Sequence, residues 1–182
     1  MLGVFERKGI PREPRDAASP GAEAYDVLLF GLGRFGTAIG MRLKARGVRV
    51  LGVDFSPAAV QRWRELGLDA AFGDATDPEF VSELPLARAS WLVSTVPVHL
   101  PGVTVEDARR TLIQISRLAG FSGRVAVASH NDRETRDLSD AGADVVLEPF
   151  QDAADRAADI LCGGDARERT RFPAIPAEPV PG

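Results

Sequence analysis

Three glycines and one aspartate are the residues of this chain whose types and spacing could do chemistry. Gly31, Gly33 and Gly36 form G-x-G-x-x-G directly after the apolar run 27–30, and Asp54 closes a second apolar run. The first glycine permits a tight turn out of a strand, the second leaves room for a pyrophosphate beside the backbone, and the third lets a helix pack closely on the strand. A helix that starts in this loop points free N–H groups and its positive dipole end at phosphates. The pattern predicts a dinucleotide-binding βαβ unit.

Asp54 indicates which nucleotide this unit would take. It follows Gly36 by eighteen residues, where a carboxylate can accept hydrogen bonds from an adenine ribose. Its negative charge would repel a 2′-phosphate, which favours NAD(H) or an adenine nucleotide such as AMP, ADP or ATP over NADP(H). The residues alone leave another interpretation open, a structural glycine turn with Asp54 capping the helix that follows Ser56 and Pro57.

Short β-branched runs alternate with helical patterns between residues 25 and 162. We expect strands near 26–30, 48–53, 69–72, 90–95, 124–128 and 144–147, and helices near 34–46, 57–66, 78–83, 104–119, 132–141 and 151–161. Strands that alternate with helices indicate βαβ units with right-handed crossovers. With the glycine motif after the first strand, the order predicts a Rossmann-type α/β fold, a doubly wound six-stranded parallel sheet in the order 3-2-1-4-5-6.

The carboxyl ends of the later strands supply further candidates, because such a sheet binds its ligand there. Asp74 is either a ligand contact or the N-cap of the helix that begins at Pro78, and Thr95 suits a phosphate or ribose although turn chemistry also explains it. His130 stands alone, so we interpret it as a loop residue. The predicted nucleotide contacts are Gly31, Gly33, Arg34, Phe35, Gly36, Asp54, Phe55, Asp74, Ala75 and Thr95.

Composition restricts the function classes. The net charge of −4 over 182 residues does not suit a general nucleic-acid partner, and Cys162, the single cysteine, suits a reducing compartment. One cysteine and two separated histidines cannot build a standard zinc site, so we expect no metal. Proline-rich residues 1–24 and 163–182 read as a linker and a disordered tail around one domain, 25–162.

Three segments carry a resemblance to a known family. They are GLGRFGTAIGMRLKARGVRVLGVDFSP, FGDATDPEFVSELPLARASWLVSTVP and AGADVVLEPFQDAADRAADIL. Together they resemble an RCK/KTN domain, the Trk-type nucleotide-binding module that regulates potassium conductance. The form is most similar to the cytoplasmic C-terminal domain of Kef-type cation:proton antiporters, and the likeness covers about residues 25–162.

This resemblance implies a regulator that binds NAD(H) or an adenine nucleotide and controls a membrane transporter of potassium or another monovalent cation. The transporter would be covalently linked or a separate subunit, which places the domain at the cytoplasmic face of the membrane. Residues 1–24 resemble the juncture after such a membrane part.

The resemblance also implies a homodimer. Arg34 would lie near the phosphates and reach toward the dimer partner, and the pairing surface would come from segments 104–119 and 132–141. The apolar side chains of segment 104–119 form a stripe that could pack either against the dimer partner or on the sheet. One stripe cannot do both. The stripe consists of Val105, Ala108, Leu112, Ile115 and Leu118.

Catalysis is disfavoured by the motifs. G-x-S-x-G and the phosphate-binding G-x-x-x-x-G-K-[ST] do not occur, and no acid–base pair stands out. We therefore expect a regulatory domain and not an enzyme. The alternatives are the cofactor-binding domain of an NAD-dependent oxidoreductase and a redox-sensing transcription factor, which the acidic balance disfavours.

Overall fold

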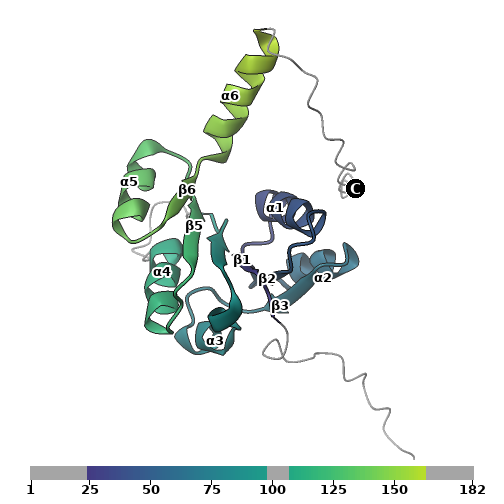
Figure 1. Cartoon of the computed structure of the whole chain (residues 1–182), viewed down its shortest axis with the longest axis vertical. Helices are drawn as coiled ribbons and strands as arrows, with labels where there is room; N and C mark the ends of the chain where they lie inside the picture. The colour runs from purple at the N-terminus through teal and green to yellow at the C-terminus, as the bar shows by residue number, and fades with distance from the viewer. Residues whose placement is uncertain (1–23, 98–106, 163–182) are drawn as a thin grey trace, which may run out of the picture.

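A computed structural model describes residues 24–97 and 107–162 of the chain. Its centre is a six-stranded parallel sheet in the order β3-β2-β1-β4-β5-β6, so the predicted Rossmann-type fold is confirmed (Figure 1). The strands are β1 Val27–Phe30, β2 Val50–Asp54, β3 Asp69–Phe72, β4 Trp91–Ser94, β5 Arg124–Ala128 and β6 Val145–Leu147. The helices are α1 Arg34–Lys44, α2 Pro57–Glu65, α3 Pro78–Glu83, α4 Ala108–Leu118, α5 Asp132–Asp140 and α6 Pro149–Leu161, with a 3-10 turn at Leu86–Arg88.

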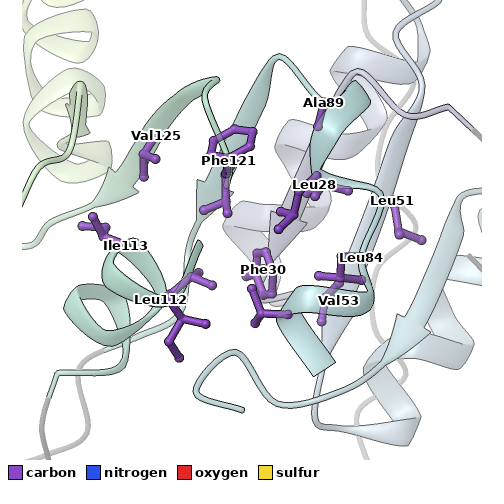
Figure 2. Close-up of a cluster of buried hydrophobic side chains, with 14 of the residues drawn as sticks. Leu28, Phe30, Leu51, Val53, Leu84, Ala89, Leu112, Ile113, Phe121 and Val125 are labelled. Atoms are coloured by element: carbon purple, nitrogen blue, oxygen red, sulfur yellow. The ribbon is translucent and has the colours of Figure 1, made fainter. Parts of the chain in front are cut away.

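The sheet is covered on both faces, and its first strand, at the centre of the sheet, is accordingly apolar throughout. All four residues of β1 are buried, as expected of a parallel strand between two helical layers. Its side chains alternate between two cores. Leu28 and Phe30 pack with residues of α3, α4 and α5, whereas Val27 and Leu29 pack with residues of α1 and α2. Figure 2 shows the first of these cores, with Leu112 and Ile113 of α4.

Trp63 fills the core between α1, α2 and the sheet and is fully buried. A Cβ at Gly40 or Gly52 would lie 2.6 or 2.5 Å from its ring, so these two positions make room for the indole. Its Nε1 donates to Thr37 Oγ1 at 2.9 Å, and that hydroxyl donates to the carbonyl oxygen of Leu32 at 3.0 Å. The second core is therefore hydrogen-bonded to the glycine loop.

The apolar stripe expected on segment 104–119 covers the sheet. Leu112 and Ile115 of α4 are buried in the core, so they are not available to a dimer partner, and the prediction that they form a pairing surface was wrong. Leu118 is 89% exposed, and Val105 lies outside the described residues. The buried face of α4 is instead centred on Arg109, Leu112, Ile113 and Ser116, at helical spacing.

Helix α6 is the one element that leaves the sheet. It begins at Pro149, two residues earlier than predicted, and extends away from the rest of the fold (Figure 1). None of its residues is buried. Its apolar side chains nevertheless recur at helical spacing on one side, at Phe150, Ala154, Ala157 and Leu161. Within residues 24–97 and 107–162, no helix has the length and apolarity to cross a bilayer.

Candidate functional site

The glycine loop between β1 and α1 is shaped by two contacts that exclude side chains. Gly31 has φ of +90°, and a Cβ there would lie 2.9 Å from the backbone nitrogen of Val96. A Cβ at Gly36 would collide with the carbonyl oxygen of Gly31 and lie 2.8 Å from Thr95 Oγ1. These two glycines therefore bring the strand, the helix and the end of β4 together, as their positions in the motif predict.

Gly33 differs from its two neighbours in the motif. A Cβ built on it meets nothing within 4 Å, and its φ of −68° is one that any residue adopts. Nothing in the described protein requires glycine at this position. The space around this position is therefore open, and in the motif it is where a bound phosphate would approach the backbone.

The N-terminus of α1 is left without a side-chain cap. Gly33 is the N-cap residue, no side chain bonds to the first turn, and that turn contains no acidic residue. In contrast, α2, α3, α4 and α5 are each capped by a side-chain oxygen, those of Ser56, Asp77, Asp107 and Asn131. Helix α6 is also without a side-chain cap, but its first turn carries Asp152. The first N–H groups of α1 are thus unused by side chains and lie beside the open space, an arrangement that suits an anion.

Asp54 is tied to the glycine loop. Its Oδ2 accepts a hydrogen bond from the backbone N–H of Leu32 at 2.7 Å, and its Oδ1 accepts one from that of Ser56 at 2.8 Å. The cap of α2 is Ser56, whose Oγ accepts from the N–H of Ala59, so the interpretation of Asp54 as a helix cap was wrong. A carboxylate has about four acceptor sites, so two remain for ribose hydroxyls.

Asp74 and Thr95 also make local bonds. Asp74 Oδ1 accepts from both the backbone N–H and the hydroxyl of Thr76, each at 2.8 Å. Asp77, not Asp74, caps α3, so the N-cap interpretation of Asp74 was wrong. Thr95 donates its hydroxyl to the carbonyl oxygen of Gly31 at 2.7 Å, which fastens the end of β4 to the loop.

The remaining predicted contacts surround the same edge of the sheet. Arg34 is exposed at the first position of α1, and Phe35 beside it is half-buried. Phe55 is 64% exposed directly after β2. Ala75 is half-buried and packs against the core on the α3 side. His130, in the loop after β5, contacts the ring of Phe150, with 5.6 Å between the centroids.

A charged cluster at the end of β5 was not predicted from the sequence. Arg109 of α4 is 1% exposed and donates to Asp107 at 2.7 Å, to Glu134 of α5 at 3.1 Å and to the carbonyl oxygen of Ala128 at 2.8 Å. The signal was present, because Arg109 stands three and four residues before Leu112 and Ile113, on the apolar face of its helix.

Burial and hydrogen bonding oppose one another in this cluster. Partial burial raises the pKa of the Asp107 carboxyl, but the hydrogen bonds and the positive charge of Arg109 outweigh it and hold that pKa below its ordinary value. Partial burial likewise raises the pKa of Glu134, and bonds from Arg109 and the backbone N–H of His130 lower it further than burial raises it. Burial lowers the pKa of Arg109 itself, but its two carboxylate partners raise it by more, so the pKa lies above its ordinary value. All three groups are therefore stabilised in their charged forms.

The site thus combines an uncapped helix start, an open loop position and a strand-end carboxylate. Among the described residues, no three histidine, cysteine or acidic side chains are grouped to hold a metal ion. The profile of the TrkA-N domain matches residues 27–149. The chain belongs to the TrkA-N domain family.

Two relatives are each 28% identical to this chain. Ktr system potassium uptake protein C of Bacillus subtilis (strain 168) is 28% identical over 133 residues, which are 73% of this chain and 57% of the relative. The glutathione-regulated potassium-efflux system protein KefC of Cronobacter sakazakii is 28% identical over 148 residues, 74% of this chain and 23% of the relative. The chain therefore spans about half of one and a quarter of the other.

Solved structures share the fold. The TrkA-N domain of the inner membrane protein YbaL from Escherichia coli superposes with a TM-score of 0.65 at 24% identity, covering 77% of this chain and 98% of that one. The GsuK channel bound to NAD gives a TM-score of 0.60 at 19% identity, covering 78% of this chain and 24% of that one. The Kef C-terminal domain of Shewanella denitrificans in its AMP-bound form gives 0.54 at 22%, covering 75% and 80%.

Proposed function

We propose that this chain is a regulatory nucleotide-binding domain that controls a transporter of potassium or another monovalent cation. The observation that carries the proposal is the open position at Gly33, flanked by the uncapped start of α1 and by Asp54. Phosphates would sit on the N–H groups of the first turn, and the ribose hydroxyls would donate to Asp54. The ligand would be NAD(H) or AMP, ADP or ATP, and a 2′-phosphate would be repelled.

The relatives support the two halves of this proposal. One solved neighbour is described as bound to NAD and another as AMP-bound, and both have this fold. The relatives at 28% identity are named as potassium uptake and potassium-efflux proteins. By this analogy the domain would act at the cytoplasmic face of the membrane, beside a transporter that is linked to it or separate. Nucleotide would favour one conformation of the domain, and the transporter would respond to the shifted population.

We also infer that the domain works as a homodimer, with α6 as the pairing element. An amphipathic helix whose apolar side is bare needs a partner. Phe150, Ile160 and Leu161 are 71, 43 and 85% exposed in the single chain. A second copy offers the same apolar helix, so a two-fold pairing would bury both faces at once.

Regulation is favoured over catalysis by the chemistry at the sheet edge. The charged groups at the end of β5 bond to one another, and the carboxylate at the end of β2 bonds to the backbone. None of these arrangements holds an acid–base pair ready for a substrate. A cofactor domain of an NAD-dependent oxidoreductase would use the same glycine loop, and its distinguishing property would be turnover.

Titration calorimetry of the purified chain tests the proposal, with NAD⁺, NADH, AMP, ATP and NADPH as ligands and light scattering for the mass. We expect binding of at least one adenine nucleotide without a 2′-phosphate, weaker binding of NADPH, and the mass of a dimer. Absence of binding by all five ligands would refute the nucleotide part. A monomeric mass would refute the α6 pairing.

A further inference from the structure

Two large aromatic side chains are exposed at the edge of the sheet that holds Asp54. Phe55 is 64% exposed and Phe72 is 60% exposed. Phe55 follows the last residue of β2, and Phe72 is the last residue of β3. Both residues stand at the ends of adjacent strands, and only Phe55 was among the contacts predicted from the sequence.

The sheet register places Phe72 directly beside Asp54. The two residues are paired between the parallel strands β2 and β3, and the backbone N–H of Gly73 donates to the carbonyl oxygen of Asp54 at 3.1 Å. Paired residues of neighbouring strands lie about 5 Å apart and direct their side chains to the same face.

The face is identified by the neighbours of each strand. Asp54 reaches the N–H of Leu32 in the loop that leads into α1. Ala70, two residues before Phe72, packs in the core that contains Trp63, on the side of α1 and α2. Since alternate residues of a strand share a face, Phe72 is directed to the same side as Asp54.

We propose that Phe72 is the platform on which the purine base of the nucleotide stacks; this rests on the proposed nucleotide-binding function. With phosphates at the start of α1 and the ribose at Asp54, the base continues along the sheet edge toward β3. The residue that it meets next is Phe72. An exposed phenyl face beside the ribose site is the surface that a nucleobase stacks on.

Stacking of this kind has a predictable size and selectivity. Removing an aromatic platform weakens the binding of a base by about tenfold or more. A tyrosine in place of the phenylalanine keeps the aromatic face, whereas leucine keeps apolar area without it. The affinity would therefore depend on the aromatic ring at position 72 and on the presence of a base in the ligand.

The experiment compares AMP binding to the wild-type chain, Phe72→Leu and Phe72→Tyr, with Leu118→Ala as a control at an exposed apolar position on α4. Calorimetry gives the affinity, and the proton resonances of the adenine ring report stacking, because a phenyl face shifts them upfield. Thermal unfolding of each variant verifies that it is folded.

We expect Phe72→Leu to weaken AMP binding about tenfold and to reduce the upfield shift, and Phe72→Tyr and Leu118→Ala to match the wild type. Unchanged AMP affinity in Phe72→Leu, or an adenine shift that persists in it, would overturn the stacking proposal and leave the nucleotide function standing. A wild-type chain that binds AMP with no upfield shift of the adenine protons would overturn it too. A wild-type chain that binds neither AMP nor NAD⁺ would overturn the proposed function itself.

Discussion

The β1–α1 loop and the β5–α5 loop lie at the same carboxyl edge of the sheet, but their polar groups are hydrogen-bonded to different extents. Where β1 runs into α1, the helix start is uncapped and the loop carries a glycine with nothing within 4 Å of its Cβ position. Where β5 runs toward α5, Asn131 caps the helix, and Arg109 is bonded to two carboxylates and a carbonyl oxygen. The first region leaves hydrogen-bonding capacity for a ligand. The second has used its capacity to hold α4, β5 and α5 together.

This contrast teaches that charge at the carboxyl edge of a Rossmann sheet is not by itself a sign of a binding site. The more heavily charged end is the structural one here. The proposed binding end is distinguished by a helix start that has neither a side-chain cap nor an acidic residue in its first turn. Variants at the two ends should therefore separate into those that change stability and those that change affinity.

The largest effect is expected from Arg109→Met. The variant leaves Asp107 and Glu134, each about one-quarter exposed, without their shared cation, and leaves the carbonyl oxygen of Ala128 without its donor. We expect the free energy of unfolding to fall by about 3 kcal/mol, measured by urea denaturation. Nucleotide affinity of the folded protein should be unchanged. A loss of affinity without a loss of stability would place Arg109 in the binding site and break the comparison.

The two glycines of the loop should give opposite results. Gly36→Ala forces a Cβ against the carbonyl oxygen of Gly31, and we expect it to cost about 2 kcal/mol of stability. Gly33→Ala enters open space and should stay within about 1 kcal/mol of the wild type. Gly33→Val should weaken nucleotide binding about tenfold or more by occupying the phosphate approach. Urea denaturation measures the change in stability, and calorimetry on the same samples measures the change in affinity. Full affinity in Gly33→Val would show that the nucleotide binds elsewhere.

Asp54→Ala should affect both properties. The backbone N–H of Leu32, a buried residue, loses its acceptor, so we expect a loss of about 1–2 kcal/mol of stability together with weaker nucleotide binding. Asp26→Ala is the matched control, since Asp26 Oδ2 accepts from the backbone N–H of Arg49 at 2.9 Å at the opposite edge of the sheet. The control should lose stability and keep its affinity. Equal loss of affinity in both variants would show that Asp54 acts through the fold alone.

The smallest effect is a dependence on pH at the structural end. The pKa values of Asp107 and Glu134 are lowered by folding from ordinary values of 3.8 and 4.5. A lowered carboxyl pKa contributes stability above the unfolded value and loses it as the pH falls through the folded value. Urea unfolding should therefore show stability declining below about pH 5, and the Glu134→Gln variant should decline less steeply. If the stability of the wild type and of Glu134→Gln fell equally steeply with pH, Glu134 would not contribute to the loss of stability in acid.

The fold and most of the motif could be predicted from sequence because they rest on local rules. The apolar runs of β1 and β2, the glycine spacing and the alternation of elements all follow from period and turn chemistry. The partners of single carboxylates could not be predicted in this way. Asp74 and Asp77 both precede Pro78 at cap-like spacing, and the backbone path decides that Asp77 caps α3.

Side-chain orientation on α4 also depended on tertiary packing. The expected stripe ran through Leu118, whereas the helix presents Arg109 to the core with Leu112 and Ile113. An arginine on an apolar face contradicts hydropathy patterning, and it is stable there because Glu134 comes from another helix. Phe72 was missed for a related reason, since its proposed role depends on its register with Asp54, 18 residues away in the sequence.

The hydrogen-bonded chain from Trp63 through Thr37 to Leu32 gives the protein an optical reporter of its own. The indole is fully buried, and its N–H is two hydrogen bonds from the carbonyl group of the residue between the first two glycines of the loop. A ligand that shifts this loop would alter the bonding of this indole, and the emission of Trp63 would respond to it. With the other tryptophan removed by Trp91→Phe, intrinsic fluorescence would then follow occupancy of the loop in solution, with no label attached to the chain.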